Sequence, residues 1–315
     1  METDCHHIIS YDQLGKSALH CAAESGQVQC CAALLDAGAS LSLTDNLSQT
    51  PLHLAISMNR AEVCKLLIQR GANPDQLNAE RATLLHLAAT SGATDVGEIL
   101  CQAGVNVNAV DVMNRTALFC AAREGHAETC RKLIQMGGSV VIAKTNGATP
   151  LAVAAESGSV GCCQVLLEYG SDPSATRSDS ATPLILACQN GHFNVCELLI
   201  KQGAVVNACM SDKATPLFIA AQEGHSDICK LLLDNGALVN AARDDGATPL
   251  IVVAFKGHHD CLRVLLSYRA DVNMVDRRGK NAIDWAMHAK REDIAEELRK
   301  AQFVCCSQCI YQYLT

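Results

Sequence analysis

Short apolar runs alternate with glycine-centred breaks along almost the whole chain. In residues 215–236, Thr215 and Pro216 open one apolar run, Gly224 and His225 interrupt it, and a second run ends at Gly236. Threonine is a favoured N-cap, proline is tolerated at the first helical position, and glycine adopts the left-handed conformation that ends many helices. The pattern predicts two short antiparallel helices, and neither can bury its apolar face alone.

The same unit returns every 33 residues without an insertion. The N-cap position is occupied by Ser17, Thr50, Thr83, Thr116, Thr149, Thr182, Thr215, Thr248 and Asn281. The position after the second helix is occupied by Gly38, Gly71, Gly104, Gly137, Gly170, Gly203 and Gly236, and then by Arg269. A strict period of this length predicts a stack of repeats, each buried against its neighbours, rather than one large core.

Three sets of residues resemble the ankyrin-repeat family: Thr50 to Ala55, which reads TPLHLA, the pair Gly224-His225, and Gly236 to Asn240. The resemblance implies an all-α ankyrin-repeat solenoid of helix-turn-helix units joined by β-hairpin loops. Nine repeats would fill residues 12–301 and start at residues 12, 45, 78, 111, 144, 177, 210, 243 and 276. Residues 1–11 would form an N-terminal arm and residues 302–315 a cysteine-rich apolar tail. The resemblance also implies a concave face, lined by hairpin tips and first helices, that binds other proteins.

The chain has 18 cysteines, and six of them share one position in the second helix: Cys31, Cys64, Cys130, Cys163, Cys196 and Cys229. Free cysteine is among the most buried residue types, so we expect a ladder of small core side chains. The spacing fits no zinc motif. We find no signal peptide and no apolar run long enough for a membrane span. A thiol-rich chain of this kind predicts a cytoplasmic protein, with the nucleus as an alternative.

The net charge of −8 is unevenly distributed. Residues 243–301 carry 11 basic and 10 acidic side chains, whereas residues 1–242 carry 14 basic and 23 acidic ones. This acidic body argues against nucleic-acid binding. Seven of the 11 histidines fall in two repeat positions, which favours a structural role for them. With no catalytic triad, phosphate loop or carboxylate pair, we predict no enzyme activity, no cofactor and no metal.

The hairpin tips differ most between copies, so they are candidates for partner binding. The position two residues after each repeat start is mostly apolar early in the chain, acidic in the middle and basic at the end: Leu47, Met113, Asp179, Asp212, Asp245 and Arg278 are the residues concerned. The acidic residues predict either a rail for a basic segment of a partner or ordinary turn chemistry. Phe255, followed by Lys256, is either a binding anchor or a ring folded over that lysine.

Two further sets of residues are candidates for modification. Asn108, Asn207, Asn240 and Asn273 should bond the turn backbone, and by resemblance they could be hydroxylated by an asparaginyl hydroxylase. Cys305, Cys306 and Cys309 lie in an uncharged tail. That tail is either a loosely docked end or an S-acylated segment that tethers the chain to a membrane.

The two ends of the array are predicted to differ. The second helix of repeat one carries few charges, which predicts an N-terminal face covered by a partner or by a missing segment. We expect Trp285 in the core of repeat nine. The leading function is a non-catalytic scaffold or adaptor. A substrate-recognition subunit of a ubiquitin ligase is the alternative, although the 14 residues after the repeats are too few for a recruiting box.

Overall fold

The computed structural model describes residues 11–312, with side chains described as far as residue 302. Each repeat contributes two helices. The first helices are α1 Ala18–Ser25, α3 Pro51–Ser57, α5 Leu84–Thr90, α7 Ala117–Glu124, α9 Pro150–Glu156, α11 Pro183–Gln189, α13 Pro216–Glu223, α15 Pro249–Lys256 and α17 Ala282–His288. The second helices are α2 Val28–Asp36, α4 Ala61–Gln69, α6 Thr94–Gln102, α8 Ala127–Gln135, α10 Val160–Glu168, α12 Phe193–Lys201, α14 Ser226–Asp234, α16 His259–Ser267 and α18 Glu292–Gln312. The all-α repeat solenoid is confirmed.

The first helices begin and end at the predicted residues. Thr215 has an extended backbone, and its hydroxyl accepts a hydrogen bond from the N–H of Phe218 at 3.2 Å. Pro216 follows at the first helical position, where its missing N–H has no intrahelical partner to lose. The helix ends at Gly224, which has φ of 86°. The local signals therefore set both limits of a helix that is too short to be stable by itself.

The predicted β-hairpin loops are tight turns in this structure. Within the described residues, strand pairing is limited to isolated antiparallel bridges, between Tyr11 and Ser17 and between Leu77 and Thr83. Elsewhere the tip closes without a strand bridge, through bonds such as Asp45 N–H to the Gln49 carbonyl at 2.9 Å. Each arm is too short to form a ladder.

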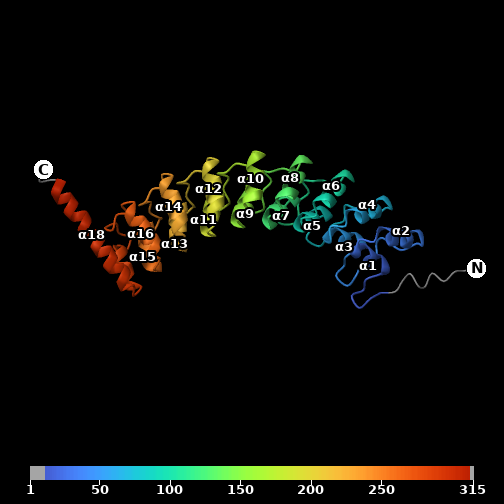
Figure 1. Cartoon of the computed structure of the whole chain (residues 1–315), viewed down its shortest axis with the longest axis horizontal. Helices are drawn as coiled ribbons and strands as arrows, with labels where there is room; N and C mark the ends of the chain where they lie inside the picture. Colours follow the sequence, from blue (N-terminus) through green and yellow to red (C-terminus); the bar gives the residue numbers. More distant parts are fainter. Residues whose placement is uncertain (1–10, 313–315) are drawn as a thin grey trace, which may run out of the picture. The chain divides into compact units, whose positions relative to one another are not determined.

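Packing follows the repeat. The chain divides into two compact units, and in each of them the first helices lie in one row and the second helices in another (Figure 1). The ladder of six cysteines is confirmed as core, because each of these side chains is 0% exposed. Phe218 and leucines such as Leu118 and Leu133 fill the rest of the space between helix pairs.

Of these two units, unit 1 comprises residues 1–154 and 161–171, and unit 2 comprises residues 155–160 and 172–315. In unit 2, Arg269 has φ of 61°, so it adopts the left-handed conformation of the glycines that it replaces. The backbone of α18 continues through most of the predicted tail, while the side chains of Cys305, Cys306 and Cys309 lie outside the described residues. No helix among the described residues combines the length and apolar character that membrane crossing requires.

Candidate protein-binding surface

The tip face of each unit consists of the turns that open the repeats and the exposed sides of the first helices. Most neighbouring tips within a unit are joined by backbone hydrogen bonds. The Val112 N–H donates to the Glu80 carbonyl at 2.9 Å, and the Thr145 N–H donates to the Met113 carbonyl at 3.0 Å. These bonds hold successive turns in register, so that variable tip side chains form one surface.

A histidine joins some repeats from within the tip face. Nδ1 of His86 accepts the backbone N–H of Thr83 at 3.1 Å, which leaves the proton on Nε2. Nε2 then donates to the Arg115 carbonyl of the next repeat at 2.8 Å. Burial lowers the pKa of His86 and keeps the ring neutral near pH 7. His20 makes the same bond to the Gln49 carbonyl at 3.0 Å. These histidines are structural.

Two other side chains join successive repeats. Nε2 of His126 lies 3.1 Å from the Thr90 carbonyl of the preceding repeat. Asn108 donates to the Gly137 carbonyl at 2.9 Å and accepts the Ser139 N–H at 2.8 Å. Asn207 makes the equivalent pair of bonds with Gly236 and Leu238. Asn240 and Asn273 each accept one bond from the segment that follows, from the Asp271 N–H and from Gln302 Nε2 respectively. Asn108, Asn207 and Asn240 therefore bond the turn one repeat further on, whereas Asn273 bonds a side chain of α18.

Repeats two and three lack all of these connections. Among the described residues, no hydrogen bond or ion pair joins the tip and helices of repeat two (residues 45–70) to those of repeat three (residues 78–104). The causes are local. Asp75 stands at the position equivalent to Asn108, and Ala93 stands at the position equivalent to His126. Nε2 of His53 reaches no carbonyl of repeat three.

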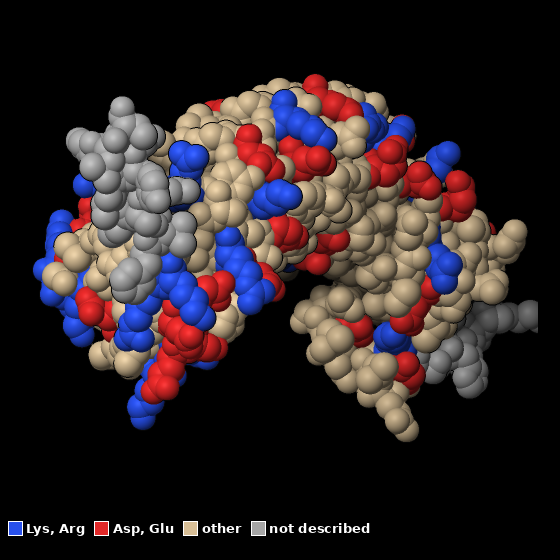
Figure 2. Space-filling model, turned by 60° about the vertical axis from the view of Figure 1, so that its left-hand side comes forward, with Lys and Arg blue, Asp and Glu red and all other residues tan. Residues whose placement is uncertain are grey.

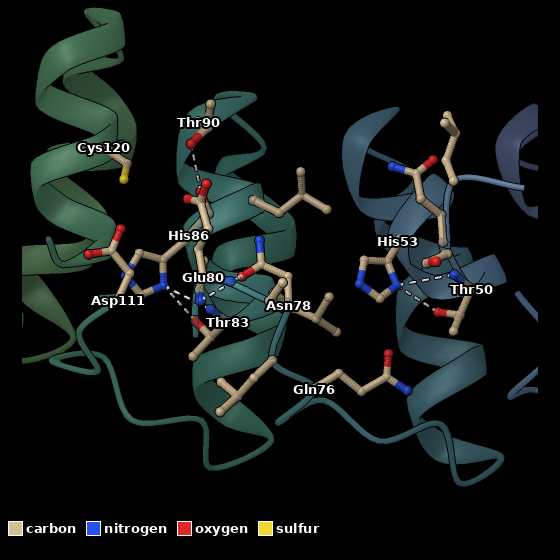
Figure 3. A pocket seen from close by; sticks show the side chains of 18 of the residues that line it. Thr50, His53, Gln76, Asn78, Glu80, Thr83, His86, Thr90, Asp111 and Cys120 are labelled. Carbon is tan, nitrogen blue, oxygen red and sulfur yellow. Dashed lines mark hydrogen bonds between the residues drawn. The ribbon is translucent and has the colours of Figure 1, made fainter. Parts of the chain in front are cut away.

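The result is a hollow of about 880 Å³ between α3 and α5, which we call the interrepeat hollow. α3 and α5 share less contact than α5 and α7, whereas α4 and α6 pack as other second helices do. Figure 3 shows His53 with Nδ1 turned to Thr50 and the opposite edge of its ring directed towards the space beside α5. Leu47 and Leu77 line the hollow and are 78% and 56% exposed. Apolar side chains and a free imidazole N–H thus face the same space.

The missing connections predict a weak point in unit 1. Amide hydrogens of α1–α4 should exchange about tenfold faster, or more, than those of α5–α8, because each lost hydrogen bond removes roughly 1 kcal/mol. Replacing Asp75→Asn restores a side chain able to bond Gly104 and Asn106, and should slow that exchange severalfold. Asp75→Ala removes the same charge without adding an amide. Equal exchange for the two variants, by mass spectrometry, would contradict this explanation.

The acidic tip residues are largely engaged within their own turns. Nη2 of Arg177 lies 2.5 Å from Oδ2 of Asp179, and Arg243 pairs with Asp245 at the same distance. The bond from Arg177 lowers the pKa of Asp179 to about 2, and Arg243 likewise lowers that of Asp245. Both aspartates also accept the N–H two residues further on.

Hydrogen bonding within the tip turns explains the positions of the three aspartates. In repeats that begin with aspartate, such as Asp45 and Asp111, Oδ1 of that residue accepts the N–H groups two and four residues on. Where the first position is Arg177, Met210 or Arg243, an aspartate two residues later takes over one of these bonds. Turn chemistry therefore accounts for the position of Asp179, Asp212 and Asp245, and whether they also form a rail for a basic segment stays a prediction.

The other predicted binding residues separate into two places. Leu47 lines the interrepeat hollow of unit 1, and Met113 lies outside it, 40% exposed. In unit 2, a hollow of about 340 Å³ is lined by Asp245, Phe255, Lys256 and Arg278. Trp285 lines the same hollow and is half-buried, so the expectation that it lies in the core was wrong. Its indole N–H donates to Asp276 at 2.8 Å. Asp276 is the first residue of the repeat, nine positions before Trp285, and no sequence pattern links the two.

The described residues hold no cluster of three or more histidine, cysteine or acidic side chains that could bind a metal ion. On α2, Cys30 is exposed and Cys31 is buried. The covered N-terminal face stays a prediction.

Comparison with known proteins identifies the repeat. A family model described as ankyrin repeats (three copies) matches residues 3–78, 19–111, 61–144, 85–177, 174–243 and 235–307. The crystal structure of the human ASB11 ankyrin repeat domain is 30% identical, with a TM-score of 0.65, over 70% of this chain and 98% of that one. No curated protein matches the sequence. The chain is a member of the ankyrin-repeat family.

Proposed function

We propose that this protein is a non-catalytic scaffold or adaptor that holds a segment of a partner protein on its tip face. Ankyrin repeats generally mediate protein–protein interaction, which supports the class of function. The observation that carries the proposal for this chain is the interrepeat hollow, with Leu47 and Leu77 exposed where it opens.

The chemistry of the hollow suits an inserted side chain. Its volume of about 880 Å³ lies in the range of ligand pockets, roughly 300–1,000 Å³. A partner side chain placed there would cover Leu47 and Leu77, whose present exposure is unfavourable. A backbone carbonyl of the partner would accept the Nε2–H of His53, which donates to no group of repeat three. Both gains require an extended segment rather than a flat surface.

The charge of the partner segment is less constrained than the tip sequence suggests. Two of the three stacked aspartates are neutralised by their own arginines. The carboxylate of Asp212 forms no ion pair within the described residues and accepts the Ala214 N–H. A basic partner segment therefore has weaker support than an apolar one, and the interrepeat hollow is the better place to test.

Proximity labelling in cells tests the function. Changing Leu47→Asp together with Leu77→Asp should remove most of the partners labelled by the wild-type chain, because a charge at the opening opposes burial of apolar partner groups. Leu238→Asp is the matched control, since Leu238 is 62% exposed and lies outside the hollow. An unchanged set of labelled proteins for the double variant would contradict the proposal.

The same labelling experiment addresses two of the remaining predictions, and separate measurements address the two modifications. Labelled ubiquitin-ligase subunits would favour the substrate-recognition alternative, and the compartments of the labelled proteins would test the cytoplasmic assignment. Hydroxylamine-sensitive acylation of Cys305, Cys306 and Cys309, and the intact mass for hydroxylation of Asn108, Asn207, Asn240 and Asn273, test the two proposed modifications.

A further inference from the structure

We propose that the hollow around Trp285 in unit 2 binds a short protein segment in which an acidic residue stands next to a large apolar one. We call it the tryptophan pocket and define it by Phe255, Lys256, Arg277, Arg278 and Trp285. The inference rests on the proposed function, since it assigns a protein ligand, but it concerns a different unit and a different chemistry.

The base of the tryptophan pocket is aromatic. The rings of Phe255 and Trp285 meet edge to face, with centroids 5.5 Å apart. Phe255 remains 42% exposed even with this contact. Phe255 comes from the end of α15 and Trp285 from α17, so the two rings meet at a junction between repeats. Aromatic side chains held in this way are typical anchors for an apolar partner group.

The carboxylates of the pocket are already engaged. Asp245 is bound by Arg243, and this bond lowers the pKa of Asp245. Oδ2 of Asp276 accepts the indole N–H of Trp285, and its Oδ1 accepts the backbone N–H groups of Arg278 and Lys280. Burial acts to raise the pKa of Asp276, yet these bonds outweigh it and the net shift is downward. Both groups are therefore ionised near pH 7 and have little capacity to hold a basic ligand.

Three cations that line the pocket, Lys256, Arg277 and Arg278, are not paired with acids, whereas Arg243 is bound to Asp245. Lys256, Arg277 and Arg278, and Lys280 beside the Trp285 ring, form no ion pair among the described residues, whereas several other cations of unit 2, such as Lys201 and Lys213, do. The Arg278 guanidinium lies 5.7 Å and the Lys280 ammonium 5.1 Å from the centroid of the Trp285 ring. Lys and Arg gather over the C-terminal repeats, at the left of Figure 2. The pocket is thus a local positive site in a chain whose net charge is −8.

These features select the occupant. An apolar side chain would cover Phe255, and an adjacent carboxylate would reach Lys256, Arg277 or Arg278, which form no ion pair within the described residues. Single-stranded nucleic acid would need an open aromatic face for base stacking. Here Phe255 and His288 approach Trp285 edge-on, while Arg278 and Lys280 lie over its ring. An apolar side chain packed against the exposed part of Phe255 needs no open ring face, so a peptide is the favoured ligand.

Selection from a random heptapeptide library displayed on phage, against the purified full chain, tests the proposal. We expect the enriched sequences to place aspartate or glutamate beside phenylalanine, tryptophan or leucine. Trp285 is the single tryptophan of the chain, so its fluorescence reports occupation of the pocket directly. Synthetic peptides from the selection should change that fluorescence saturably, with an affinity that falls as salt is added.

Variants locate the binding. Lys256→Glu combined with Arg278→Glu should weaken binding by about tenfold or more, as expected for residues central to an interface. Lys230→Glu is the matched control, because Lys230 is exposed on α14 and lies outside the pocket. Phe255→Ala should also weaken binding, and circular dichroism checks that each variant is folded.

Three outcomes would overturn the proposal. They are no enrichment or a basic consensus, peptide affinity unchanged by the Lys256 and Arg278 reversals, and tighter binding of a thymidine oligonucleotide than of the selected peptides. Partner capture by the interrepeat hollow is measured separately in cells. Failure here alone removes only the tryptophan pocket, whereas failure of both measurements removes the proposed function as well.

Discussion

In the folded protein, Cys64 and Cys163 are expected to react with iodoacetamide on the order of a thousandfold more slowly at pH 8 than Cys30. The thiolate is the reactive form, and burial raises the pKa of both Cys64 and Cys163 to about 12. Raising a thiol pKa to that value leaves only about one thiolate in ten thousand at pH 8. Both side chains are 0% exposed, so access adds to the effect, while Cys30 is exposed.

Peptide mapping after timed labelling measures the rates residue by residue. In guanidinium chloride all cysteines should react at similar rates, which provides the control for local sequence effects. Labelling of Cys64 in the native protein at the rate of Cys30 would mean that the cysteine ladder is not the closed core described here.

The second large effect concerns two glycines that have nearly the same backbone conformation. Gly224 and Gly236 have φ of 86° and 85°, so alanine at either position incurs the left-handed penalty of about 1–2 kcal/mol. A Cβ at Gly236 would meet no atom within 4 Å, whereas a Cβ at Gly224 would lie 2.9 Å from the ring of His258. His258 cannot move away freely, because its Nε2 bonds the Gln222 carbonyl at 3.1 Å.

We therefore expect Gly224→Ala to lower the free energy of unfolding by about 3 kcal/mol, against about 1 kcal/mol for Gly236→Ala. Denaturant unfolding followed by circular dichroism gives both values. The chain also offers an internal check: in a His258→Ala background, Gly224→Ala should cost no more than Gly236→Ala. If the cost of Gly224→Ala is the same in both backgrounds, contact with His258 is not its cause.

Much of the architecture could be predicted because its causes are local. Thr215, Pro216 and Gly224 act within one turn of the backbone, so the limits of α13 follow from neighbouring residues alone. The cysteine ladder was predictable for a related reason, since Cys196 and its equivalents lie on the same face of every second helix. A side chain repeated at that position must be buried if the repeats stack at all.

The candidate binding sites could be predicted only in part. The tip residue Leu47 and the helix-end residue Phe255 stood out as departures from the repeat, and each lines a hollow. The interrepeat hollow was missed. Asp75 and Ala93 mark a pair of repeats that lacks two recurring side chains, but Val141 and Ser159 mark another such pair, so the sequence does not single out the position of the hollow. Reading each repeat by itself hides such a loss, because the bond partners lie 29 to 36 residues away.

By itself, the sequence determined the period, the helix limits, the buried faces and the family, since these depend on contacts within a turn or on a pattern that nine copies repeat. Only the tertiary structure decided which carboxylates are free, where neighbouring repeats part and that Trp285 lines a pocket. Those properties depend on how two side chains from different repeats meet. A difference of one hydrogen bond or one ion pair there is too small to leave a pattern in the sequence, yet it determines which surface is open to a partner.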